Sequence, residues 1–280
     1  MYDLLIRNAQ LLDGSGQPAF RGDLAIEQER ITAIGDLATA DAHYSIDAQG
    51  HIVCPGLIDI HTHSDLTLAL DGRALSSLSQ GVTTQIMGNC GVSAAPTRDY
   101  QPYYGPLDPA MTRGLTCDWT DFGEYFQRLE DKGLGTNAAT LVGHGNVRVA
   151  AMGYDDRAPN PTEMQRMKTL VDRAMADGAL GLSSGLAYAP GPYAELQELV
   201  ELGKIVGTYS GIYTSHIRNQ TESIAEAVGE VIAVGEQAAV SAHVSHMQPG
   251  SPMLGATAVA VHPEDEGRLT LQSSQVELAP

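Results

Sequence analysis

The chain is poor in cysteine, with three cysteines among 280 residues and no repeating spacing between them. An odd count of this kind does not form a disulfide framework, so we expect the protein to occupy a reducing compartment. Basic residues are also scarce, since Lys and Arg total 16 against 34 Asp and Glu, for a formal net charge of −18. Nucleic acid and anionic membrane surfaces are therefore not expected as main partners, because binding to phosphate groups needs clustered Lys and Arg.

Long apolar runs are missing as well. No stretch of about 18 apolar residues occurs, so the sequence predicts no transmembrane helix. The opening MYDLLIRNAQLL carries charged residues and has no apolar core of the signal-peptide type. We therefore expect neither a signal peptide nor a lipid anchor, and a cytoplasmic location.

The pattern of apolar and turn residues changes after about residue 50. Residues 1–50 consist of short β-type runs separated by Gly, Asp and Asn, which predicts a small antiparallel sheet or sandwich. From Ile52 onward, short and nearly all-apolar runs alternate with helix-like stretches, as in a parallel sheet covered on both faces. Helical spacing predicts one helix between Pro161 and Gly178 and another in residues 221–237.

Six of these apolar runs read as strands of β/α units. They occupy residues 52–63, 81–91, 137–146, 178–188, 210–220 and 239–248. A (β/α)₈ barrel has eight such strands. The fold class is therefore predicted as α/β, with an incomplete TIM-like barrel of about six strands in residues 51–248 and an atypical tail in residues 249–280.

Two histidines, His61 and His63, end the first of these runs in the sequence GLIDIHTHSD. Residues i and i+2 of a strand point the same way, so the two imidazoles are expected to face one side together. In a parallel barrel, ligands gather where the strands end and the following loops begin. Neutral imidazole is a common ligand of divalent transition metals, although a structural pair of histidines explains this motif alone equally well.

Three later strand ends each supply another candidate ligand. These are Cys90 in IMGNCG, His216 in YTSHIRN and His246 in HVSHMQ. Thiolate and imidazole together suit zinc. Each residue alone is explained by a structural role, as a buried inert cysteine or a hydrogen-bonded core histidine. Their occurrence at successive strand ends favours a shared metal site.

Two further histidines are open to more than one interpretation. His144, in LVGHGN, belongs either to a substrate-binding loop or to a simple turn. His243 lies three residues before His246, an odd separation that puts the two on opposite sides of a strand. We therefore expect His243 to be structural or to face outward.

Six ordered motifs run through the chain: CPGLIDIHTHSD, LSQGVTTQIMGNCGVSAAP, LVGHGNVR, GALGLSSGLAYAPG, YTSHIRN and HVSHM. Together they resemble the amidohydrolase superfamily, and most closely its N-acyl-D-amino-acid deacylase (D-aminoacylase) branch, from residue 1 to about residue 247. The resemblance implies a zinc-containing TIM-like barrel flanked by a small β-sandwich that is built partly from the N-terminal segment. It also implies a small-molecule substrate, an N-acyl-D-amino acid, whose amide bond is hydrolysed.

The resemblance also implies roles for single residues. The tight zinc ligands of the branch are matched by Cys90, His216 and His246. The ligands of a second, weaker metal position, which shares Cys90, are matched by His61 and His63. Tyr188, in GLAY, matches a residue that contacts the carboxylate of the substrate.

Many related amidohydrolases bridge two metals with a carboxylated lysine on the fourth strand. The fourth apolar run, residues 178–188, contains no lysine, and Cys90 on the second strand can take the bridging place. This difference separates the chain from hydantoinase-like and dihydroorotase-like relatives, which hydrolyse cyclic amides. A cyclic-amide hydrolase of that kind is the alternative function.

After HVSHM the sequence departs from the family pattern, as in a truncated or chimeric chain. Gln248 stands where the family has a lysine that helps to hold the substrate carboxylate. The family's general base, an aspartate at the end of the eighth strand, has no counterpart here, so no catalytic residue is assigned. We expect self-association through the open barrel edge and impaired activity, with an inactive metal-binding fragment as a further alternative.

Overall fold

The computed structural model describes residues 1–99, 101–247 and 269–271. The chain divides into two compact units, Met1–Leu57 and Ile58–Pro280. The boundary expected after residue 50 falls just before the last strand of the first unit. Among the described residues, no helix combines the length and the apolar character needed to cross a membrane.

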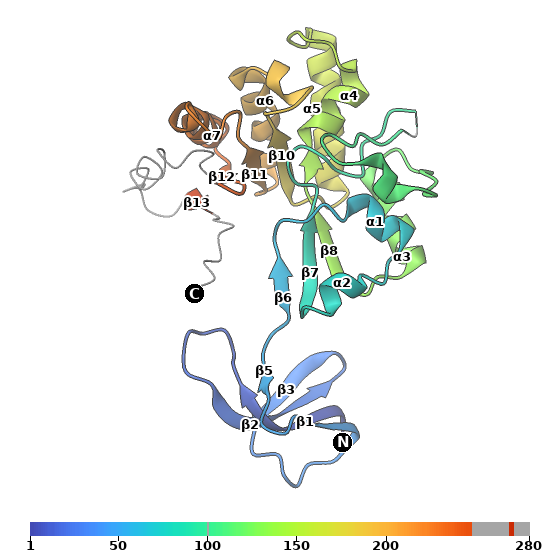
Figure 1. The fold of residues 1–280 in the computed structure, drawn as a ribbon, viewed down its shortest axis with the longest axis vertical. Coiled ribbons are helices and arrows are strands. Elements are labelled where there is room, and N and C mark those ends of the chain that lie inside the picture. The colour runs from blue at the N-terminus through green and yellow to red at the C-terminus, as the bar shows by residue number, and fades with distance from the viewer. Residues whose placement is uncertain (100, 248–268, 272–280) are drawn as a thin grey trace. The chain divides into compact units, whose positions relative to one another are not determined.

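The first unit is a single five-stranded sheet (Figure 1). Its strands are β1 (Tyr2–Leu11), β2 (Phe20–Glu27), β3 (Arg30–Gly35), β4 (Ala42–Asp47) and β5 (Ile52–Val53). Strands β1, β2 and β3 pair antiparallel, whereas β4 and β5 pair parallel to β1. The expected antiparallel pairing therefore holds for β1, β2 and β3 and is wrong for β4 and β5. The chain between β3 and β4 returns to the start of β1, so that Ala42 pairs with Tyr2 and both strands run the same way.

The second unit contains the predicted parallel strands and, last in the chain, one strand that was not predicted. They are β6 (Leu57–Asp59), β7 (Val82–Met87), β8 (Asn137–Thr140), β9 (Val142–Gly143), β10 (Gly181–Gly185), β11 (Ile212–His216), β12 (Ser241–Val244) and β13 (Leu269–Leu271). Strands β6, β7 and β8 form one sheet, and strands β9 to β13 form another in sequence order. Every one of the six apolar runs contains a strand, which confirms the α/β fold class. Gln248 and the atypical tail lie outside the described residues, apart from β13.

Helices follow the strands of the second unit. They are α1 (Asp65–Leu70), α2 (Leu75–Leu78), α3 (Phe122–Lys132), α4 (His144–Met152), α5 (Pro161–Ala176), α6 (Leu196–Thr208) and α7 (Ile224–Ala238), with short 3₁₀ turns η1 (Pro109–Thr112) and η2 (Gly191–Tyr193). Both predicted helices, α5 and α7, are confirmed. Helix α5 begins with a capping box in which Asn160 and Glu163 bond each other's backbone, with Pro161 in the first turn.

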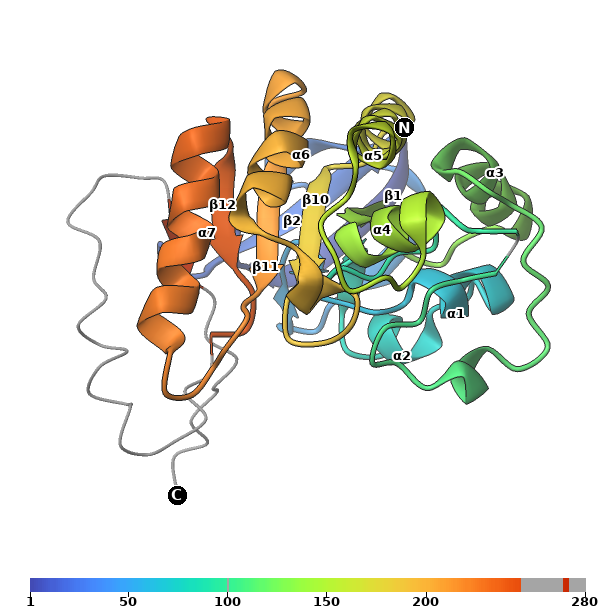
Figure 2. The same ribbon diagram turned by 90° about the horizontal axis from the view of Figure 1, so that it is seen from above.

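Helices α5, α6 and α7 lie side by side against one face of the larger sheet (Figure 2). Apolar residues at helical spacing, such as Met167 and Val171 of α5, are fully buried there. They join Val244 of β12 in one core, so the helices fix the strands whose ends carry the candidate ligands. Strand β6 is less well covered by neighbouring elements. Among the described residues it pairs only with β7, and Ile58 and Ile60 are exposed to solvent.

Candidate metal centre

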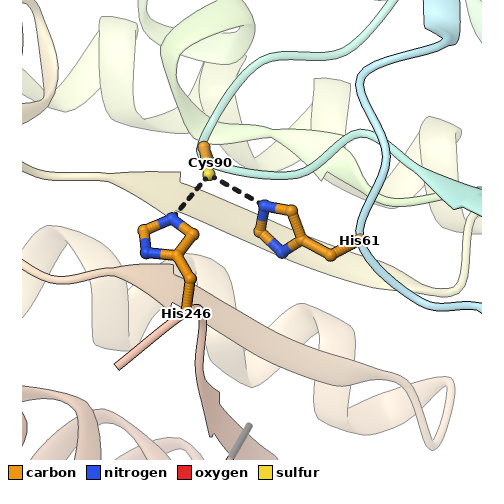
Figure 3. Close-up of side chains that lie close together, drawn as sticks. All are labelled: His61, Cys90 and His246. Carbon is orange, nitrogen blue, oxygen red and sulfur yellow. Dashed lines mark hydrogen bonds between the residues drawn. The ribbon is translucent and has the colours of Figure 1, made fainter. Parts of the chain in front are cut away.

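Three predicted ligands converge at the ends of β6, β7 and β12 (Figure 3). The sulfur of Cys90 lies 3.3 Å from Nε2 of His61 and 3.2 Å from Nε2 of His246. All three donor atoms lie within 4.8 Å of one another. Sulfur and nitrogen ligands of one tetrahedral zinc, at about 2.3 and about 2.0 Å from the metal, lie about 3.5 Å apart. The donor set and its spacing therefore fit a zinc ion.

The other two predicted ligands surround this group. The ring of His63 lies 5.5 Å from that of His61, and the ring of His216 lies 4.4 Å from that of His246. The rings of His61 and His246 are themselves 5.1 Å apart. The structure thus gathers all four imidazoles and the thiol in one place, although His63 and His216 stand outside the closest three-donor group.

The loop after β7 fixes the direction of the Cys90 side chain. The backbone of Cys90 is left-handed, with φ 55°, between Gly88 and Gly91, which are left-handed too. A Cβ on Gly88 would lie 1.9 Å from the carbonyl oxygen of Leu141, so only glycine fits there. Ser183 of β10 accepts a hydrogen bond from the Gly91 N–H at 3.0 Å. Neighbouring strands therefore hold this tight loop in place.

Burial sets the charge state of the cluster. It lowers the pKa of both His61 and His216 to about 4, with repulsion from His246 as the next cause. Burial also lowers the pKa values of His63 and His246. At neutral pH all four imidazoles are therefore uncharged, the form that binds metals. The Cys90 thiol, whose pKa burial raises to about 12, would ionise only on binding a cation.

Tyr188 lies at the edge of the cluster. Its ring is 5.3 Å from that of His216, and its hydroxyl donates to the carbonyl oxygen of Cys90 at 2.5 Å. Besides the implied contact with a substrate, the residue therefore has a direct contact with the Cys90 loop.

Replacing Tyr188 by phenylalanine is expected to destabilise the metal-free protein by about 1 kcal/mol, because a buried carbonyl loses its donor. Urea denaturation of the two proteins measures this difference. Tyr209→Phe is the matched control, since the Tyr209 hydroxyl bonds Asp172 at the surface. Equal midpoints for the two variants would contradict the assigned role.

His144 is neither a loop ligand nor a turn residue, so both interpretations are wrong. It is the first residue of α4 and is fully buried, with Nε2 2.7 Å from Oε1 of Glu198 in α6. The other oxygen of Glu198 accepts from Arg148 at 2.5 Å. Although burial raises the pKa of Glu198, the hydrogen bond from His144 and the charge of Arg148 leave it below its usual value.

The pattern of the sequence does not predict this ion pair. The only local signal is the spacing of His144 and Arg148, which puts both on one side of a helix. Glu198 comes from a different helix, so no pattern in the sequence links it to them.

The outward-facing alternative for His243 is also wrong. Ala242 and Val244, its neighbours in β12, pack into the helix-covered core. His243 therefore points to the other face, and its imidazole contributes to the lowered pKa of His61. Strand parity does not relate His243 to His246, because β12 ends at Val244 and His246 lies beyond it with φ 32°.

Comparison with known proteins gives consistent matches. A family model described as "Amidohydrolase family" matches residues 45–248. A D-aminoacylase from Alcaligenes xylosoxydans xylosoxydans is 38% identical over 255 residues, which cover 91% of this chain and 52% of the relative. The chain thus spans about half the length of the curated relatives it matches.

Solved structures agree with these matches. An N-acyl-D-glutamate deacylase from Bordetella bronchiseptica, complexed with zinc and a phosphonate mimic of the tetrahedral intermediate, superposes with a TM-score of 0.87. The two are 34% identical, and the match covers 97% of this chain and 58% of that one. An L-hydantoinase from Arthrobacter aurescens has a TM-score of 0.63 at 19% identity, which is a likeness of fold alone.

Proposed function

Because this chain belongs to the amidohydrolase family, we propose that it carries the metal centre of a zinc-dependent enzyme that hydrolyses the amide bond of N-acyl-D-amino acids. The observation that carries the proposal is the convergence of His61, Cys90 and His246 at the ends of three strands. When bound, zinc would polarise the acyl carbonyl of the substrate and lower the pKa of a water molecule. The side chains of the protein supply the metal-binding atoms and orient the substrate.

We assign the donors to two positions that share Cys90. The tight position takes Cys90, His216 and His246, and the second, weaker position takes His61 and His63. The placement of the Cys90 sulfur between Nε2 of His61 and Nε2 of His246 supports this sharing. We assign the phenol of Tyr188 to the substrate carboxylate, and its position beside His216 supports this assignment.

The finer fold assignment is part of the same proposal. Strands β6 to β12, with β8 and β9 taken together as one strand, correspond to the first six strands of an eight-stranded barrel, over residues 51–248. Residues 1–50 correspond to one portion of a β-sandwich, and residues 249–280 to a tail of unfamiliar type. Three free cysteines are compatible with a reducing compartment such as the cytoplasm.

Two other functions predict that different compounds bind at the metal centre. A cyclic-amide hydrolase would bind a 5-substituted hydantoin, and an inactive metal-binding fragment would bind no substrate at all. Strand β10 contains no lysine, which argues against the lysine-bridged centre of hydantoinase-like relatives.

A cobalt-substituted form of the 280-residue protein tests these functions. Because Cys90 supplies a thiolate, we expect a sulfur-to-cobalt absorption band in the near ultraviolet. N-acetyl-D-methionine should change the visible cobalt spectrum in a saturable way and bind about 10-fold or more tightly than the L-enantiomer. Release of D-methionine is measured in parallel.

Each outcome of this titration separates the alternatives. A spectral response to a hydantoin but to neither N-acetyl-methionine would favour the cyclic-amide hydrolase. Cobalt binding with no response to any of these compounds would leave the metal-binding fragment. A protein that shows no sulfur-to-cobalt band would refute the metal centre itself.

A further inference from the structure

Asp65 is a buried carboxylate that the proposed function does not use. It is the first residue of α1, and only 3% of its surface is exposed. Among the residues that the structure describes, neither carboxylate oxygen has a hydrogen-bond partner. Burial raises its pKa to about 7, and the nearby N–H groups of Asp65, Gly88 and Ala94 lower it without reaching hydrogen-bond geometry. An unpartnered buried carboxyl group destabilises a fold, so its presence here calls for another explanation.

Next to this carboxylate lies a small cavity. Asp65 and His63 both line it, together with Ser93, Tyr104 and other residues. The space open to the centre of a water molecule measures about 20 Å³, enough for one water, which needs roughly 10–15 Å³. Nδ1 of His63 is buried and, within the described part of the chain, has no partner either. Three unpartnered polar atoms thus belong to two residues that line one water-sized cavity.

We propose that Asp65 is a positioning residue for His63, acting through one water molecule held in this cavity. The water accepts the Nδ1–H of His63 and donates to the Asp65 carboxylate, so Nε2 of His63 is left free for a metal. Ligating histidines commonly donate their second N–H to a carboxylate, directly or through water, which fixes the tautomer and the ring orientation. The inference rests on the proposed function only in taking His63 as a metal ligand.

Asp65→Asn separates this role from a merely structural one. The substitution keeps the size of the side chain and removes the buried charge. The metal-free variant should therefore be as stable as the wild type or more stable. Its affinity for zinc at the weaker position should fall about 10- to 100-fold. A merely structural role would instead lower both the stability of the metal-free protein and its affinity for zinc.

The measurement is a zinc titration against a competing chelator, with urea denaturation of the metal-free proteins. Asp108→Asn is the matched control, because Asp108 lines the same cavity but is exposed and caps η1 by accepting the Ala110 N–H. Asparagine keeps that cap, so the control should bind zinc like the wild type. In a His63→Ala background, Asp65→Asn should have no further effect on zinc affinity.

Several results would overturn the inference. Undiminished zinc affinity in Asp65→Asn, or an equal loss in the His63→Ala background, would remove the positioning role and leave the proposed function standing. A wild-type protein that binds no zinc would refute both. A crystal structure of the zinc-loaded wild type supplies a check that needs no variant: a water must bridge Asp65 and His63, and a dry cavity contradicts the proposal.

Discussion

Cys90→Ala is expected to remove stoichiometric zinc binding from the protein. The Cys90 sulfur lies within 3.3 Å of Nε2 in both His61 and His246, so its loss affects both proposed metal positions. Loss of a thiolate ligand should weaken zinc binding by about 100-fold or more, given that structural zinc sites bind with roughly 10–16 kcal/mol. Zinc content after exhaustive dialysis measures the effect, and the sulfur-to-cobalt band should vanish with it.

The control for this substitution is Cys54→Ala. Cys54 is exposed, lies in the first unit and is not one of the candidate ligands, so its removal should leave zinc content unchanged. Alanine and cysteine both carry a Cβ, so the left-handed backbone at Cys90 is no more strained in the variant. Full zinc occupancy in Cys90→Ala would show that the sulfur is not a ligand.

The strand and helix pattern of the second unit could be predicted because it is local. Parallel strands covered by helices are apolar throughout, and each of the six runs contains a strand. The exposure of Ile58 was not predictable, because it depends on which strand lies beside β6. The parallel pairing of β4 with β1 escaped prediction for a similar reason, since only the path of the connection decides it.

The site shows the same division between local and long-range information. The meeting of Cys90 with His246 follows from the rule that parallel strands end at one edge, and the two side chains lie in contact in the structure. Whether these residues bind zinc remains a prediction. The hydrogen bond from Tyr188 to the Cys90 carbonyl oxygen joins residues 98 positions apart, and no pattern in the sequence predicts it.

Glu198→Ala is expected to be the most destabilising of the substitutions considered. Arg148 and His144 are fully buried, and Glu198 is the carboxylate that both contact. Without it, the Arg148 charge stays in the core, and its remaining partners among the described residues are the carbonyl oxygens of Asp155 and Arg157. Breaking a buried pair in this way costs about 3–5 kcal/mol. Urea denaturation with an unchanged slope against denaturant measures the loss.

Helix α6 supplies the matched control for this prediction. Glu201 pairs with Lys168 and Lys204 at the surface, and such pairs contribute about 0–1 kcal/mol, so Glu201→Ala should have a small effect. The double variant Arg148→Met/Glu198→Leu should recover part of the stability, because neither buried charge then needs a partner. Equal losses in Glu198→Ala and Glu201→Ala would contradict this account. Because Glu198 contacts His144 and Arg148 rather than the candidate metal ligands, folded Glu198→Ala protein should still bind zinc.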